Sequence, residues 1–346
     1  MRCPYCLQEV KKHTRDARRG THRCPSCNTL IPKVLLRESE HLQATVGVVG
    51  FSGHGKTVYL TSLFSVLKKF SEFWPDYYYS ALDEYTRRII YQHVPIFEQG
   101  GLPDSTPANF PNPAMVEYHA IPVFGNAFVG FYDTAGEVFT NGKQIERAGT
   151  FVAHSDVALL IISIPDCDPE RRDDEMSRLL DTYVRAAEDR LNANIGQDQR
   201  LVVIFTKSDL LLGQMDPELK DWLRGGADAW YMSEMHDKLT MLSVISINIE
   251  EWLRDSLGCH RFTNMARDRF REVRYTIVSA LGAEGPSGSG TPAPLRVLDP
   301  FIWILLFSRN KLTDVPLPNL WRRLLSWARI RRAAPSLPPS TPQSNL

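Results

Sequence analysis

The stretch "VGVVGFSGHGKTVYL", residues 46–60, is an apolar run that breaks into glycines, then into a lysine and a threonine, and then resumes. Gly50, four further residues and then Gly55, Lys56 and Thr57 match the G-x-x-x-x-G-K-[ST] pattern of a loop that binds phosphates. Glycines let backbone N–H groups point inward, and a helix starting near Gly55 adds the positive end of its dipole. The pattern predicts a buried strand, a phosphate loop and a helix, with these residues at the phosphates: Gly50, Ser52, Gly53, His54, Gly55, Lys56, Thr57 and Val58.

Three side chains of this loop have different expected roles. Lys56 would reach the β- and γ-phosphates, and the Thr57 hydroxyl would ligate Mg²⁺. His54 either touches phosphate or fills a position that tolerates many residues, and the second interpretation is favoured.

A second motif, "FVGFYDTAGE" (128–137), reads as a strand that ends in an acidic residue. Asp133 at the tip of such a strand would hold Mg²⁺ through a water molecule. Gly136 would approach the γ-phosphate closely enough to donate its N–H group.

Two later motifs concern the base of a nucleotide. In "LVVIFTKSDLL" (201–211), a strand ends in Thr206, Lys207 and Ser208, followed by Asp209. The Asp209 carboxylate can accept hydrogen bonds from guanine N1–H and N2–H₂, whereas adenine offers no such donor pair, and an unpaired buried group is costly. The aliphatic stem of Lys207 would pack on the base, and in "RYTIVSALG" (274–282) backbone N–H groups would meet guanine O6 from Ser279, Ala280 and Leu281.

These four motifs, in this order and each at a strand end, resemble those of the Ras-like, TRAFAC-class GTPases over about residues 44–282. The resemblance implies GTP or GDP, Mg²⁺ and two switch regions that respond to the γ-phosphate. The cysteine-rich start, the "VLDPFIWILL" ending (297–306) and a long insert before the first switch are similar to bacterial double-GTPase-type proteins with an N-terminal zinc ribbon. That group is often linked to conflict or defence operons.

The sequence departs from the family pattern at both switches. Thr106, in "GLPDSTPANF" (101–110), is the best candidate for the threonine that binds Mg²⁺ and the γ-phosphate, and Ser105 is the alternative. The family's water-positioning glutamine would follow Gly136, but this chain has Glu137 there. A carboxylate beside a γ-phosphate adds like-charge repulsion, so we expect slow hydrolysis with Lys56, Thr106, Gly136 and Glu137 as the catalytic set.

Four cysteines near the N-terminus predict a metal site. "CPYC" (3–6) and "CPSC" (24–27) are two C-x₂-C pairs whose spacing is typical of a structural zinc site. Cys3, Cys6, Cys24 and Cys27 would place four thiolates around one Zn²⁺, which leaves no open position for catalysis. Between the pairs, "KKHTRDARRG" (11–20) could contact nucleic acid or an acidic protein surface, although solvated charge needs no partner.

Alternating apolar strand-like runs and amphipathic stretches predict an α/β fold with a mostly parallel sheet. We expect a P-loop domain with six strands, one of them antiparallel, at 44–50, 115–124, 128–133, 156–164, 200–206 and 273–279. The expected division is a zinc ribbon (1–35), a GTPase domain (43–332) with helical inserts (72–112 and 211–265), and a disordered tail (333–346).

The totals exclude little: among 346 residues, 40 basic side chains balance 40 acidic ones. No secretory signal or transmembrane run is present, so we expect a cytoplasmic protein. "WRRLLSWARIRRA" (321–333) is interpreted as a packed terminal helix, with contact to an anionic membrane surface or a partner as the alternative.

Together the motifs predict a GTP-binding switch that hydrolyses GTP slowly and contacts a protein partner through its zinc ribbon. Two other functions stay open: a scaffold that binds GTP with negligible turnover, and a zinc-ribbon nucleic-acid binder with a regulatory GTPase domain.

Overall fold

The structure is a computed structural model that describes residues 2–10, 15–16, 21–36, 42–74, 76–103, 112–133, 150–191, 194–225, 235–282 and 291–312. The chain divides into two compact units, Met1–Leu312 and Thr313–Leu346. The second unit, which contains the basic stretch 321–333, lies outside the described residues.

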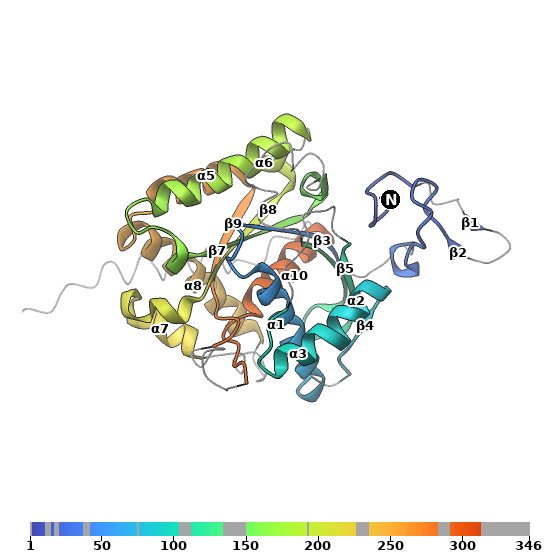
Figure 1. Ribbon diagram of the computed structural model, residues 1–346, viewed down its shortest axis with the longest axis horizontal. Helices are drawn as coiled ribbons and strands as arrows, with labels where there is room; N and C mark the ends of the chain where they lie inside the picture. The colour runs from blue at the N-terminus through green and yellow to red at the C-terminus, as the bar shows by residue number, and fades with distance from the viewer. Residues whose placement is uncertain are drawn as a thin grey trace, which may run out of the picture. The chain divides into compact units, whose positions relative to one another are not determined.

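A seven-stranded sheet in the order β4-β5-β6-β3-β7-β8-β9 forms the centre of the first unit (Figure 1). Strand β5 runs antiparallel to both of its neighbours, and the remaining strands pair in parallel. The expected α/β architecture with one antiparallel strand is therefore confirmed. The strands of the sheet are β3 (Leu42–Gly50), β4 (Tyr78–Ala81), β5 (Ala114–Ile121), β6 (Gly125–Asp133), β7 (Val157–Ser163), β8 (Arg200–Thr206) and β9 (Glu272–Ile277).

The edge strand β4 was not among the six expected strands, because its segment was interpreted as part of a helical insert. Consecutive tyrosines favour extended backbone over helix, and β4 pairs with β5 so that Tyr78 lies opposite His119. These two rings stack with their centroids 4.1 Å apart. Helical segments follow β4 in the insert: α2 (Glu84–Arg88), a π-helical turn (Ile89–His93) and α3 (Val94–Glu98).

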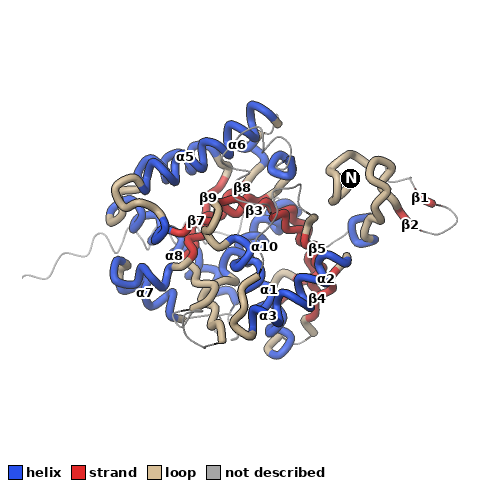
Figure 2. Tube along the Cα trace, viewed as in Figure 1, coloured by secondary structure: helices blue, strands red, loops and turns tan. Residues whose placement is uncertain are grey.

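Helices cover both faces of the sheet (Figure 2). Along β3, Val46 and Val48 belong to one buried cluster and Val49 to the other, as expected when successive side chains point to opposite faces. The first cluster includes α1 and α10, and the second includes α5 and α9. The further helices are α1 (Lys56–Lys69), α5 (Arg172–Arg185), α6 (Ile195–Asp198), α7 (Pro217–Arg224), α8 (Met235–Asp255), α9 (His260–Arg269) and α10 (Asp299–Leu312).

Helix α10 is buried throughout the sequence 301–307 and reads as a core helix. In the described part of the chain, we find no helix with the length and apolar character needed to cross a bilayer.

A buried ion pair fixes the loop that leads into α10. The Arg296 Nε donates to Asp299 Oδ2 over 2.9 Å, and the Trp222 Nε1 donates to the same oxygen over 3.0 Å. The Arg296 guanidinium also lies 3.5 Å from the centroid of the Trp222 ring. Burial lowers the pKa of Arg296, while Asp299 raises it. The carboxylate is therefore what keeps a buried cation favourable at this point.

Asp299→Asn should lower the free energy of unfolding by about 3 kcal/mol, because it leaves the Arg296 charge buried without its counter-charge. Equilibrium urea denaturation measures this loss. The double variant Arg296→Met with Asp299→Leu removes both charges and should be less destabilised than Asp299→Asn. An unchanged urea midpoint for Asp299→Asn would contradict the importance of the pair.

Candidate nucleotide and metal sites

The predicted phosphate loop connects the end of β3 to the start of α1. A Cβ atom on Gly50 would lie 2.3 Å from the carbonyl oxygen of Ile161 on the neighbouring strand β7. Only glycine therefore fits at this end of β3. Gly55, directly before α1, has φ +85°, a left-handed conformation that glycine adopts without steric cost. Both ends of the loop therefore require a residue without a side chain, whereas Phe51, Ser52 and His54 between them carry one.

The Lys56 ammonium is held against this loop. The side chain is 6% exposed, and its Nζ donates to the carbonyl oxygens of Gly50 (3.2 Å) and Phe51 (3.0 Å). Burial lowers the pKa of Lys56, while the nearby Asp133 carboxylate raises it. A cation in this position is suited to bind the anionic part of a ligand.

Two predicted magnesium ligands meet beside Lys56. Thr57 Oγ1, in the first turn of α1, donates to Asp133 Oδ2 over 3.2 Å. Asp133 is the last residue of β6 and lies opposite Val48 of β3 in the parallel pair. A hydroxyl and a carboxylate are oxygen ligands of the kind that Mg²⁺ prefers. The other predicted residues of this region, Ser105, Thr106, Gly136 and Glu137, lie outside the described residues.

The predicted base-recognition loop lies directly against the phosphate loop. Thr206, the last residue of β8, donates from Oγ1 to the His54 carbonyl oxygen over 2.8 Å. Lys207 has a left-handed backbone (φ +54°), and its Nζ lies 3.4 Å from the Gly53 carbonyl oxygen. Asp209 follows in a short 3-10 helix and is partly exposed. Lys56, the first residue of α1, and Asp209 therefore lie at the same edge of the sheet.

Asp166 is a residue of this region that the sequence analysis missed. Its Oδ2 accepts a hydrogen bond of 2.5 Å from Lys207 Nζ, and both side chains are about 40% exposed. This contact lowers the pKa of Asp166 against the opposing effect of burial. The available signal in the sequence was its place just after the apolar run that forms β7.

The 279–281 loop joins the same edge. The backbone N–H of Ser208 donates to the Val278 carbonyl oxygen over 3.1 Å, which ties the two base-recognition segments together. From α1, Ser62 Oγ donates to the Ala280 carbonyl oxygen over 3.0 Å. Ser279 and Ala280 are buried and Leu281 is partly exposed. The helix that starts at the phosphate loop thus also supports the predicted base-binding loop.

His54 turns its imidazole away from the bulk solvent and into the protein. Its Nδ1 accepts a hydrogen bond from the backbone N–H of Ser163 over 3.0 Å. Burial lowers the pKa of His54 to about 4; Asp166 opposes this shift, while Lys56 and Lys207 add to it. The neutral ring therefore links the phosphate loop to the end of β7, and a phosphate contact through its backbone stays a prediction.

The four N-terminal cysteines come together in two matching turns. Leu7 N–H donates to the Cys3 carbonyl oxygen (2.9 Å), and Asn28 N–H donates to the Cys24 carbonyl oxygen (2.8 Å). Leu7 and Asn28 share a left-handed backbone, with φ of 59° and 57°. The described parts of the segment between them include a small antiparallel pair, β1 (Arg15–Asp16) with β2 (Thr21–His22).

The geometry of the thiols fits a tetrahedral metal. The four Sγ atoms lie within 4.8 Å of one another, with Cys3 to Cys27 at 3.7 Å and Cys6 to Cys24 at 3.5 Å. Four sulfurs about 2.3 Å from a central Zn²⁺ would be roughly 3.8 Å apart. Both distances are well above the S–S bond length of a disulfide, about 2 Å. Cys3 and Cys27, and likewise Cys6 and Cys24, are therefore not bonded to each other. The set is therefore compatible with zinc.

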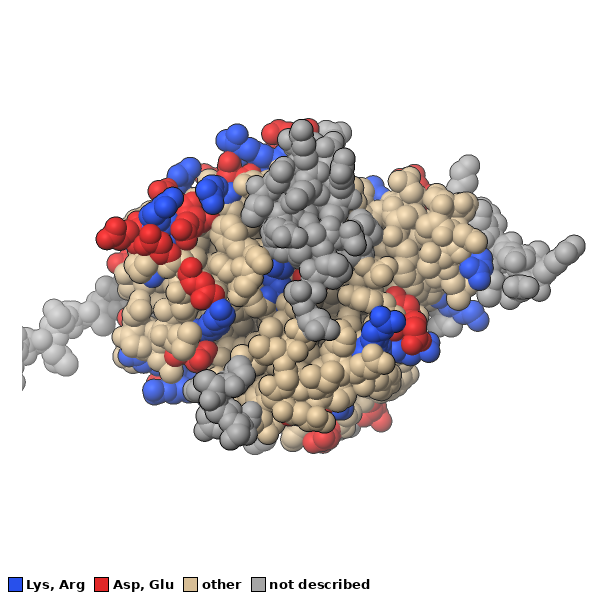
Figure 3. All heavy atoms as spheres, in the orientation of Figure 1, with Lys and Arg blue, Asp and Glu red and all other residues tan. Residues whose placement is uncertain are grey.

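Charge on the surface around α5 is mixed (Figure 3). Basic and acidic side chains alternate there and form ion pairs: Arg185 with Asp181, Arg261 with Asp174, and Arg269 with Glu188. This part of the surface lacks the single-sign patch that nucleic-acid backbones attract. Of the basic span 11–20, the structure describes Arg15–Asp16.

Comparison with protein-family models and with curated proteins finds no match. Among solved structures, the chain is similar to a bacterial selenocysteine-specific elongation factor, EF-Sec, with 12% identity and a TM-score of 0.33 over 80% of this chain and 30% of that one. It is also similar to the translation elongation factor SelB of Methanococcus maripaludis in complex with the GTP analogue GppNHp, with 12% identity and a TM-score of 0.30 over 78% of this chain and 35% of that one. The chain spans about a third of the length of these two proteins. Function is therefore inferred below from the geometry of the site.

The buried imidazole predicts a pH dependence of stability. The pKa of His54 is about 4 in the folded chain and ~6.5 in an unfolded one. As pH falls from 6.5 to 4 the unfolded state therefore gains a proton that the folded state does not, which removes up to about 3 kcal/mol of stability. Thermal or urea unfolding across this range should show a shallower fall for His54→Asn, whose Oδ1 takes the place of Nδ1 and can still accept from the Ser163 N–H. Parallel curves for the two proteins would contradict a buried neutral His54.

Proposed function

We propose that the chain binds GTP with Mg²⁺, hydrolyses it slowly and acts as a nucleotide-dependent switch. The observation that carries the proposal is the hydrogen bond between Thr206 and the phosphate loop at His54, on the same sheet edge as Thr57 and Asp133. One ligand with phosphates at one end and a base at the other would be held by both loops.

Each group of residues has a role in this proposal. The Lys56 ammonium and the loop N–H groups bind the phosphates, and Thr57 and Asp133 hold Mg²⁺, together with Thr106 or its alternative Ser105. Mg²⁺, when bound, neutralises charge on the β- and γ-phosphate oxygens. Lys207 packs along the base, Asp209 accepts from guanine, and Ala280 and Leu281 offer their N–H groups to guanine O6. The N–H of Ser279, also expected there, donates instead to the Leu295 carbonyl oxygen over 3.0 Å. Asp166 holds Lys207 in place through its ion pair.

The N-terminal cysteines belong to the proposal as a structural zinc ribbon, residues 1–35, attached to a GTPase domain at 43–332. Four thiolates saturate a zinc ion, so the ribbon would serve contact with a protein partner rather than catalysis. Membership of the double-GTPase-type group and a role in conflict or defence are part of this proposal.

Asp209→Asn should shift the base preference from guanine to xanthine nucleotides. The amide loses the two carboxylate bonds to guanine, which are worth roughly 100-fold in affinity, but it can donate to the extra oxygen of xanthine. Titration with fluorescent GDP, XDP and ADP measures the preference. Asp216→Asn is a matched control, since Asp216 is exposed at the start of α7. An Asp209→Asn chain that still prefers GDP would overturn the base assignment.

Hydrolysis should be slow in the isolated chain, with a single-turnover rate below about 1 s⁻¹. Glu137→Gln removes a negative charge beside the γ-phosphate and should raise this rate several-fold, whereas Glu170→Gln, which changes an exposed carboxylate, should not. Rapid-quench measurement of GTP cleavage gives both rates. Turnover at or above 1 s⁻¹ in the unaltered chain would disprove the slow switch, and a complete absence of turnover would favour the scaffold function.

A further inference from the structure

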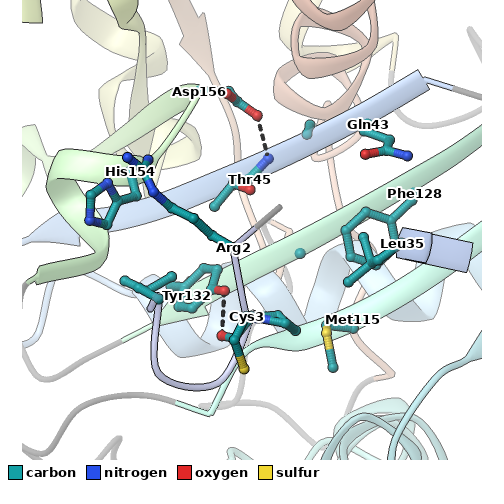
Figure 4. A pocket seen from close by; sticks show the side chains of 14 residues that line it. Arg2, Cys3, Leu35, Gln43, Thr45, Met115, Phe128, Tyr132, His154 and Asp156 are labelled. Carbon is teal, nitrogen blue, oxygen red and sulfur yellow. Dashed lines mark hydrogen bonds between the residues drawn. The ribbon is translucent and has the colours of Figure 1, made fainter. Parts of the chain in front are cut away.

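The zinc-ribbon segment touches the central sheet at the end of β6 (Figure 4). Tyr132 donates its hydroxyl to the Pro4 carbonyl oxygen over 2.5 Å. Its ring is 2% exposed and stacks on Phe151 with centroids 5.6 Å apart. Pro4 lies between Cys3 and Cys6, so this carbonyl belongs to the first metal-binding turn.

Tyr132 directly precedes the predicted magnesium ligand Asp133. Because successive side chains of a strand point to opposite faces, Tyr132 reaches the ribbon while Asp133 reaches Thr57. The pairing of β6 with β5 extends to Phe131, and its pairing with β3 continues to Asp133. The last two residues of β6, Tyr132 and Asp133, therefore pair with β3 but lie beyond the pairing with β5. The hydrogen bond of the Tyr132 hydroxyl to Pro4 is an additional contact that holds this strand end in place.

The ribbon also contacts the residue before α2 and the strands β5 and β6. Tyr5 donates its hydroxyl to Asp83 Oδ2 over 3.2 Å, and Val34 packs with Met115 and Phe128. Between these contacts and the Tyr132 bond lies a cavity of about 290 Å³ whose lining includes Arg2, Leu35, Gln43 and His154 (Figure 4). Interiors transmit displacement where they are closely packed. At the Tyr132 end of this cavity, the link between the ribbon and the strand consists of the hydrogen bond to Pro4 and of Leu7, which is buried in the same apolar cluster as Tyr132.

We propose that Tyr132 is a positioning residue that couples the metal-binding turn of Cys3 and Cys6 to the magnesium-binding carboxylate of Asp133. A metal held by the four thiolates fixes the Pro4 carbonyl, the carbonyl fixes Tyr132, and the strand end holds Asp133 toward Thr57. Zinc and Mg²⁺-nucleotide then favour each other's binding, as thermodynamic linkage requires. This inference rests on the proposed GTP-binding function.

The test measures how much Mg²⁺ the full-length, zinc-loaded chain needs to bind nucleotide tightly. Fluorescent GDP is titrated at increasing Mg²⁺, starting from magnesium-free buffer without chelator. Tyr132→Phe removes one hydroxyl and should raise the Mg²⁺ midpoint about five-fold, the effect of one lost hydrogen bond, with GDP affinity in magnesium-free buffer unchanged. Tyr5→Phe, the matched control, removes the hydroxyl bond from the ribbon to Asp83 and should leave the midpoint where it is.

A second arm starts from the unaltered sequence, whose response to zinc removal does not depend on whether a variant folds. A zinc-selective chelator should raise the Mg²⁺ midpoint of the unaltered chain and have little further effect on Tyr132→Phe. Circular dichroism checks that the sheet stays folded, and a colorimetric assay measures zinc release.

The outcomes separate the two proposals. Equal midpoints for the unaltered chain and Tyr132→Phe, or an equal shift for Tyr5→Phe, would overturn the coupling while leaving nucleotide binding intact. Absence of GDP binding at every Mg²⁺ concentration would refute the proposed function, and the coupling with it.

Discussion

One buried hydrogen bond, from the Thr206 hydroxyl to the His54 carbonyl oxygen, joins the two halves of the candidate nucleotide site. Both groups are removed from water, so separating them would leave a buried donor and acceptor unpaired at a cost of about 1–3 kcal/mol each. The Thr206 side chain also lies 3.8 Å from the place where a Cβ of Gly55 would be. The side chains of Thr206 and Lys207 thus join the predicted base-recognition loop to backbone carbonyl groups of the predicted phosphate loop.

The parallel register of β3, β7 and β8 makes this contact possible. Because parallel strands end at the same edge of a sheet, the loops that follow Gly50 and Thr206 must emerge together. The meeting of these two loops at one edge could be predicted from the sequence, because the glycine pattern and the apolar runs that mark each strand end are local signals. The sheet order and the meeting of Thr57 with Asp133 agree with that reasoning.

The contacts that the sequence did not predict are long-range pairings of single side chains. Lys207 with Asp166, His54 with Ser163 and Tyr132 with Pro4 span 41, 109 and 128 residues. None of them has a periodic pattern, and each depends on the distance between two elements that is set only when the fold is complete. The strand β4 was missed for a related reason: four residues are too few for periodicity, and pairing with β5 decides their conformation.

The strength of the ribbon contact limits what it can do. One hydrogen bond contributes about 1 kcal/mol, whereas moving a two-state equilibrium from 1:99 to 99:1 needs about 5.5 kcal/mol. A metal-bound ribbon that acts through Tyr132 can therefore bias magnesium binding but cannot switch it on or off. In the proposed function, the large change that a nucleotide switch requires would come from the γ-phosphate itself, which would contact several groups at once. In that proposal the ribbon would set the strength of the response, because it acts on the one carboxylate, Asp133, that is proposed to hold Mg²⁺.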